Sequence, residues 1–170
     1  MTNYLPRISL FLLCAGLLTT SALAADVSTS DKALVMKAAQ GGMTEVQLGQ
    51  IASKKGSSPE VKDFGSKMVA DHGKANDELK AIASSKNITI PDKLDAKHQA
   101  MVNKFNALSG AAFDKAYVNA MVEDHKKDDA LFSKEASSGT DPEIKAFAAK
   151  TDEMVKMHLT MIEDIQSKMK

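Results

Sequence analysis

Residues 58–64 read Ser-Pro-Glu-Val-Lys-Asp-Phe, and residues 141–147 repeat this phrase as Asp-Pro-Glu-Ile-Lys-Ala-Phe. Each copy has the pattern of a helix start: a capping residue, then proline at the first helical position, then glutamate in the first turn. Such residues satisfy or remove the free amides at a helix N-terminus and oppose the helix dipole. The repeat therefore predicts two similar helical halves, which favours a four-helix bundle.

Four long helices and one short helix follow from the positions of caps, glycines and prolines. The long segments are predicted at about 30–55, 59–85, 111–137 and 142–170, and the short one at about 95–108. The tight turns near residues 57 and 140 indicate antiparallel hairpins, whereas the long connection between them can cross the length of a bundle. We therefore expect an all-α, ferritin-like antiparallel four-helix bundle with a short extra helix in the crossover.

The N-terminus has the pattern of a secretory signal peptide. Arg7 precedes an apolar run over 8–18, and small residues lead to Ala24. The run is too short to span a bilayer, so we expect cleavage after residue 24, a mature domain over 25–170 without a transmembrane anchor, and a periplasmic or secreted location. Cys14, the only cysteine, lies inside the apolar run. Metal sites built from cysteine thiolates are thereby excluded from the mature chain.

Composition argues against several classes of function. The 22 basic and 22 acidic residues cancel and are interspersed, so a basic groove for nucleic acid is not expected. The sequence has no phosphate-binding glycine loop, serine-centred elbow or dinucleotide fingerprint, and no nucleophile with an oriented base. An enzyme is accordingly the third-ranked reading, and a homo-oligomer or a protein partner stays open.

Polar residues interrupt the apolar stripe of every long helix. Stepping 100° per residue around each helix places Glu45, His72 and His158 on the core faces of the first, second and fourth long helices. Asp124 and Asp128 interrupt the stripe of the third. If both hairpin turns lie at one end, the heights of these groups spread over about two helical turns, which is compatible with one polar layer.

Two interpretations fit such a layer, because an isolated buried charge is costly and must be paired or bound to an ion. The first is a site for one transition metal ion, whether zinc, iron, manganese, nickel or copper, since imidazole and carboxylate suit these metals. The second is a set of cross-helix pairs that fixes helix register. The candidate ligands are Glu45, His72, Asp124, His158, Asp128 and His125. His125, at the edge of its stripe, ranks below the other two histidines, and His98 on the short helix is expected outside the core.

Several motifs carry a resemblance to a known family. They are Glu45-Val-x-Leu-Gly, Ser58-Pro-Glu-Val-Lys-x-Phe-Gly, Met68-Val-x-Asp-His, Ala111-Ala-Phe-Asp-x-Ala-Tyr and Met121-Val-x-Asp-His. With them, nearly all of the mature chain resembles the bacterial domain-of-unknown-function family 4142. Proteins similar to it are exported, are often labelled outer-membrane proteins and are assigned to the ferritin-like superfamily. The resemblance implies a fold and a compartment, but no established activity.

Ferritin-like di-metal proteins suggest how a metal would be held. In those proteins two helices each supply a glutamate and the other two each supply Glu-x-x-His. The matching positions here are Glu45, Asp124 or Asp128, His72 and His158. Val69 and Val155 replace the two remaining glutamates, so the comparison favours one metal over two. The sequence thus predicts an exported bundle that binds a single transition metal, for sequestration or envelope stress protection. The alternative is a structural or protein-interaction module without catalysis.

Overall fold

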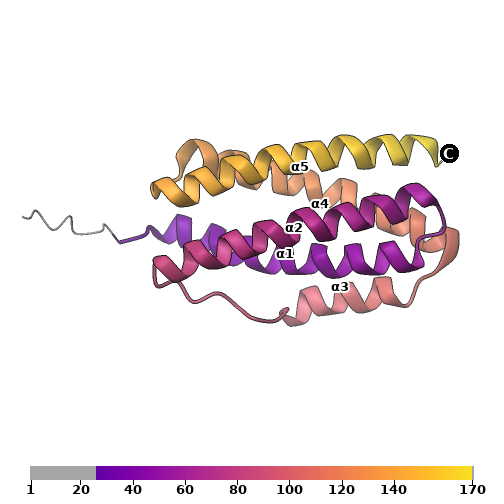
Figure 1. The fold of residues 1–170 in the computed structure, drawn as a ribbon, viewed down its shortest axis with the longest axis horizontal. Coiled ribbons are helices and arrows are strands. Elements are labelled where there is room, and N and C mark those ends of the chain that lie inside the picture. The colour runs from indigo at the N-terminus through magenta and orange to yellow at the C-terminus, as the bar shows by residue number, and fades with distance from the viewer. Residues whose placement is uncertain (1–25, 170) are drawn as a thin grey trace, which may run out of the picture.

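The computed structural model describes residues 26–169, and the predicted signal peptide lies outside the described residues. The helices are α1 (Thr29–Lys55), α2 (Pro59–Ser85), α3 (Ala96–Asn106), α4 (Gly110–Ser138) and α5 (Pro142–Lys168). No strand occurs between residues 26 and 169, so the all-α prediction is confirmed. The four long helices lie side by side, and the shorter α3 runs beside them (Figure 1). Within the described part of the chain, no helix is both apolar and long enough to cross a membrane.

The two hairpin turns lie at opposite ends of the molecule. α1 packs chiefly on α2, and α4 packs chiefly on α5. After α2 the chain returns along the length of the molecule through α3, so α4 begins beside the α1–α2 turn (Figure 1). The condition under which the heights of the polar residues were estimated, that both turns share one end, is therefore not met, because the connection reverses the chain before α4 starts. With this topology the midpoints of all four long helices meet at one height.

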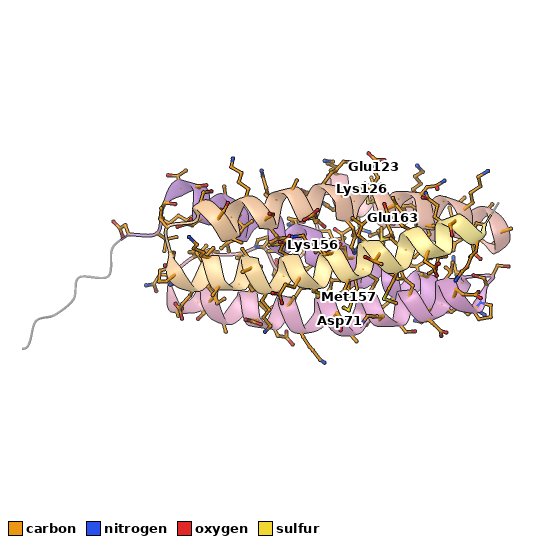
Figure 2. The ribbon with its side chains drawn as sticks, turned by 90° about the horizontal axis from the view of Figure 1, so that it is seen from above. Asp71, Glu123, Lys126, Lys156, Met157 and Glu163 are labelled. Atoms are coloured by element: carbon orange, nitrogen blue, oxygen red, sulfur yellow. The ribbon has the colours of Figure 1, made fainter. Side chains whose placement is uncertain are left out.

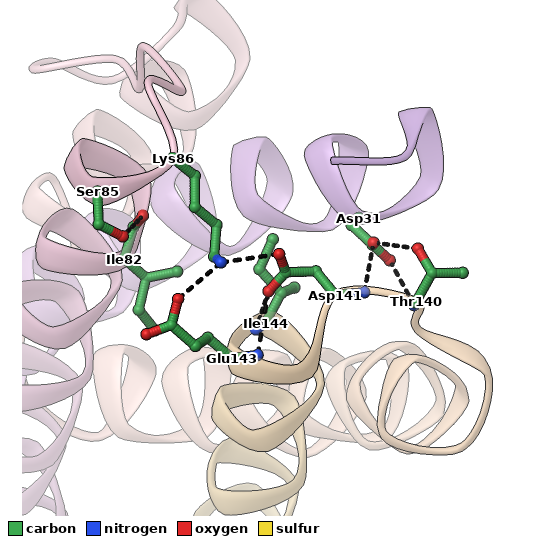
Figure 3. A network of polar contacts seen from close by, with 8 residues as sticks. All are labelled: Asp31, Ile82, Ser85, Lys86, Thr140, Asp141, Glu143 and Ile144. Atoms are coloured by element: carbon green, nitrogen blue, oxygen red, sulfur yellow. Dashed lines mark hydrogen bonds and ion pairs between the residues drawn. The ribbon is translucent and has the colours of Figure 1, made fainter. Parts of the chain in front are cut away.

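Two buried aspartates, one in each half, form hydrogen bonds with the hairpin turn of the other half. Asp114, near the start of α4, accepts hydrogen bonds of 2.8 Å from both backbone amides of residues 57–58 in the α1–α2 turn. Asp31, in the first turn of α1, accepts from the backbone amides of residues 140–141 and from the Thr140 hydroxyl at 2.6 Å (Figure 3). Asp31 and Asp114 lie 83 positions apart, the same spacing as the two helix starts at 58 and 141. The repeat thus extends to the contacts between the halves.

The interior consists of two apolar clusters with a polar layer between them. One cluster contains Phe64, Phe113 and Tyr117 and lies toward the α1–α2 turn. The other contains Phe132 and Phe147 and lies toward the α4–α5 turn. Along every long helix, buried histidine or glutamate occurs where one cluster gives way to the other. The fold thereby gathers the polar core residues of four helices at one level.

Glycine allows α1 and α2 to approach closely next to this layer. A Cβ atom on Gly65 would lie 2.7 Å from the Gly49 carbonyl oxygen, and a Cβ atom on Gly49 would lie 2.7 Å from the Gly65 carbonyl oxygen. Neither backbone oxygen can move away without moving its helix. The two glycines therefore set the spacing of α1 and α2 one to two turns from the polar residues at positions 45 and 72.

Candidate metal centre

Three histidines from three helices meet in the middle of the core. His72 comes from α2, His125 from α4 and His158 from α5, and their exposed fractions are 3%, 0% and 0%. The ring centroids lie 5.3 to 5.9 Å apart, and one nitrogen of each ring lies within 4.8 Å of the others. Phe64 packs against two of these rings, at centroid distances of 6.2 and 5.9 Å. The rings thus form a compact group that is shielded from solvent.

One nitrogen of each ring has a partner that does not belong to the three rings. Nδ1 of His72 lies 2.9 Å from Oε2 of Glu45 on α1. Nδ1 of His125 lies 2.9 Å from the Met121 carbonyl oxygen, and Nε2 of His158 lies 2.9 Å from Oδ2 of Asp71. A carbonyl oxygen only accepts hydrogen bonds, so Nδ1 of His125 carries its proton and Nε2 keeps its lone pair.

The other nitrogen of each ring has no hydrogen-bond partner. These atoms are Nε2 of His72, Nε2 of His125 and Nδ1 of His158. A buried polar atom that loses its hydrogen bond to water costs about 1–3 kcal/mol. Three such atoms in one group are therefore a costly arrangement for a protein that binds nothing there.

Burial also keeps these imidazoles neutral. It lowers the pKa of His72 to about 4 and, together with the two neighbouring rings, that of His125 to about 3. Burial lowers the pKa of His158 as well, although Asp71 opposes this shift. Neutral imidazole is the form that binds metal ions, so at neutral pH all three rings are in the state that a ligand requires.

A second group, of three carboxylates, adjoins the histidines. One oxygen each of Glu45, Asp124 and Asp128 lies within 4.8 Å of the others. Burial raises the pKa of Glu45 well above its usual range. It also raises the pKa of Asp124 and, with the neighbouring Glu45 and Asp124 carboxylates, that of Asp128 to about 8. Glu45 belongs to both groups, because its Oε2 contacts His72 and its Oε1 lies 3.9 Å from Nε2 of His125.

The structure reverses the expected order of residues on α4. The sequence placed Asp124 and Asp128 on the centre of the stripe and His125 at its edge. His125 is fully buried, whereas the two aspartates are half-buried. The core face of α4 runs through Met121 and His125, about one residue away from the expected line. All six candidate residues lie in the two adjoining groups, whereas His98 lies on α3 and pairs with Asp95.

Asp71, the partner of His158, is not among the residues predicted from the sequence. Asp71 precedes His72 on α2, so its side chain leaves the helix roughly 100° away from that histidine. It thereby faces α5, with 22% of its side chain exposed. The repeated Asp-His pairs at 71–72 and 124–125 were the available signal, since a carboxylate next to each core histidine can serve a ring on another helix.

The fold has a counterpart among solved structures. It resembles the crystal structure of a DUF305 fragment from Deinococcus radiodurans with a TM-score of 0.73. The likeness covers 84% of this chain and 98% of the fragment, at 11% sequence identity. At that identity it shows a shared fold alone. No curated protein matches the sequence.

The family is shown by the sequence itself. Residues 17–165 match the family model described as Domain of unknown function (DUF4142). The match includes all six candidate ligands and both helix-start repeats, and the resemblance inferred from the motifs is confirmed. The chain belongs to the DUF4142 family.

Proposed function

We propose that the chain binds one transition metal ion through His72, His125 and His158. The observation that carries this proposal is that the two nitrogens of each ring differ in their hydrogen bonding. One nitrogen is fixed by a carboxylate or a carbonyl, and the other is buried without a partner. Histidines that bind metals in proteins have this arrangement, because the outer hydrogen bond fixes the ring and its tautomer.

The chemistry of the three nitrogens indicates the class of metal. Imidazole suits zinc, iron, manganese, nickel and copper, and three histidines with an open position form a common zinc site. Glu45 and Asp71 are positioning residues, which orient His72 and His158 through the outer nitrogens. Coordination would replace three unsatisfied buried atoms by bonds, so ion binding would stabilise the folded chain.

Storage of the metal is favoured over catalysis at the metal. The three rings are almost wholly inaccessible and lie under Phe64, so a substrate has no direct contact with them. The four long helices with a central site are consistent with a ferritin-like bundle. Combined with the predicted export, the proposal is a metal-sequestering or stress-protective bundle of the cell envelope.

A structural module is the alternative, and one observation favours it. The pairs Glu45–His72 and Asp71–His158 join α1 to α2 and α2 to α5. Such cross-helix pairs would fix the register of three helices without any ion. On this view the unpartnered nitrogens are a cost that the surrounding apolar core offsets.

Metal analysis of untagged protein, combined with melting curves, distinguishes the metal site from the structural module. If a metal is bound, chelator should lower the melting temperature of the wild-type chain, because an ion that binds only the folded state stabilises it. His158→Ala should remove most of the bound metal and make the melting temperature insensitive to chelator. His98→Ala, outside the core, should behave as wild type. A metal-free native protein with chelator-insensitive melting would discard the metal proposal.

A further inference from the structure

The cluster of three acidic side chains, Glu45, Asp124 and Asp128, is not explained by a metal site at the three histidines. Glu45 alone serves a histidine, whereas no hydrogen bond or ion pair joins Asp124 or Asp128 to any of the three rings. The two aspartates come from the same face of α4, four positions apart, and Glu45 faces them from α1. Three acidic side chains from two helices thus converge where their mutual repulsion opposes folding.

Glu45 provides an independent sign of a missing ligand. Only 4% of its side chain is exposed. Oε2 is occupied by Nδ1 of His72, whereas Oε1 is buried without a hydrogen-bond partner. A carboxylate oxygen without a donor is more costly to bury than a neutral group. Beside it lies a cavity of about 30 Å³ lined by Glu45, His72 and Asp128, among others, which is large enough for a water molecule or an ion.

Solvent reaches this group through a groove. Asp124 and Asp128 line an open groove of about 860 Å³ between α1, α3 and α4. Lys37, Lys97 and Lys127 also line the groove. Nζ of Lys127 lies 2.7 Å from Glu123 and is thus already paired. The groove therefore supplies both a path for an ion and the water molecules that complete a coordination sphere.

We propose that Glu45, Asp124 and Asp128 bind a hard divalent cation, such as Mn²⁺, Mg²⁺ or Ca²⁺, at a second site beside the three-histidine centre. Carboxylate and water oxygens are the ligands that these ions prefer. Glu45 would use Oε1 for this cation while Oε2 keeps its contact with His72. The inference does not require that the histidines bind a metal. It differs from the single-metal expectation because Asp124 and Asp128 line the groove and form no hydrogen bond or ion pair with the three rings.

Mn²⁺ titration of metal-free protein, followed by electron paramagnetic resonance of the free ion, tests the proposal. The wild-type chain should bind one Mn²⁺ with saturation. Asp124→Asn and Asp128→Asn should each lose this binding, because an amide removes a charged ligand with little change of shape. Asp129→Asn is the matched control on the same helix, since Asp129 lies 3.5 Å from Lys156 of α5. It should bind Mn²⁺ as wild type, and circular dichroism checks that all variants keep their helix content.

The same variants distinguish this site from the three-histidine centre. His158→Ala should keep Mn²⁺ binding and lose Zn²⁺ binding, whereas Asp128→Asn should lose Mn²⁺ and keep Zn²⁺. If Zn²⁺ binds and the wild type takes up no Mn²⁺, the second site is refuted and the proposed function stands. Loss of Mn²⁺ in His158→Ala would place that ion at the histidines, and loss in Asp129→Asn would reduce it to general surface charge. Either result overturns the inference.

Discussion

Nε2 of His158 on α5 lies 2.9 Å from Oδ2 of Asp71 on α2, which joins the two hairpins at the level of the polar layer. Asp71 also pairs with Lys67 at 2.9 Å and lines a groove of about 270 Å³ between α2 and α5. Figure 2 shows it beside Met157, along the boundary of these helices. On the other side of α5, Lys126 of α4 pairs with Glu163 at 2.8 Å (Figure 2). Asp71 is thus a partly exposed carboxylate that orients a fully buried ring.

The first prediction concerns this pair. Asp71→Asn keeps an acceptor near His158 but removes the negative charge that makes the imidazole a stronger ligand. We expect Zn²⁺ affinity to fall by about 10-fold or more, measured by competition with a chelating dye, while the helix content stays unchanged. Asp77→Asn changes an exposed aspartate on the same helix and should leave the affinity as it was. Equal affinities in Asp71→Asn and wild type would contradict the positioning role.

Much of the fold could be predicted from local signals. The helix starts at 59 and 142 are marked by a cap and a proline, and the helices begin there. Local signals could not predict at which end of the molecule the α1–α2 and α4–α5 turns lie. It depends on how the chain between Ser85 and Gly110 runs back along the molecule, and on the long-range contacts of Asp31 and Asp114 with the turns. In the sequence, an aspartate near the start of a helix is an ordinary helix-start signal, whichever partner it binds in the folded chain.

The sequence was sufficient to predict which residues form the candidate site, but not how their side chains contact one another. Periodicity identified the polar residues that reach the interior, because apolar stripes locate the core face of a helix. An error of one residue in the stripe of α4 exchanges His125 with Asp124, since neighbours on a helix point about 100° apart. Which nitrogen of each ring is free depends on partners such as Met121 and Asp71. These contacts arise only when the helices pack.

The second prediction concerns the aspartates that hold the turns. Asp114→Ala leaves two backbone amides of the α1–α2 turn without their acceptor, and we expect a loss of about 2–3 kcal/mol in the free energy of unfolding. Asp31→Ala should have a similar effect at the other end. Urea denaturation measures both, with an unchanged m value as the sign of an intact fold. Asp63→Ala, an exposed aspartate on α2, is the control, and a loss as large there would remove the special role of the turn contacts.

The third prediction concerns the contribution of Glu135 to the pH dependence of stability. Its side chain is 5% exposed, and burial together with the neighbouring Asp31 carboxylate raises its pKa from 4.5 to about 7, while Lys134 slightly opposes this. The folded chain therefore binds more protons than the unfolded chain between about pH 4.5 and 7. The contribution of Glu135 to stability should therefore fall as the pH rises through this window, by at most about 3 kcal/mol.

Glu135→Gln isolates this effect, because glutamine has the shape of the protonated acid and does not titrate. The variant should be more stable than wild type at pH 8, and its advantage over wild type should grow as the pH rises from about 4.5 to 7. Chemical denaturation at several pH values measures the difference. The lowered pKa of Asp31 acts in the opposite direction, but only at pH values below about 4. A wild-type curve and a Glu135→Gln curve that run parallel from pH 5 to 8 would show that Glu135 titrates normally.

The last prediction tests whether the spacing of α1 and α2 controls the site. A Cβ atom at Gly65 would lie 2.7 Å from the Gly49 carbonyl oxygen and 2.7 Å from the Ala52 Cβ atom. Gly65→Ala should therefore push the helices apart, lower the free energy of unfolding by about 1–3 kcal/mol, and weaken Zn²⁺ binding, because the contact of Glu45 with His72 spans the same two helices.

Gly73→Ala is the control next to His72, since nothing lies within 4 Å of its added methyl group. It should raise stability by about 0.5–1 kcal/mol through helix propensity and leave Zn²⁺ binding intact. Destabilisation by both alanines, or by neither, would contradict a spacing that is set by Gly49 and Gly65.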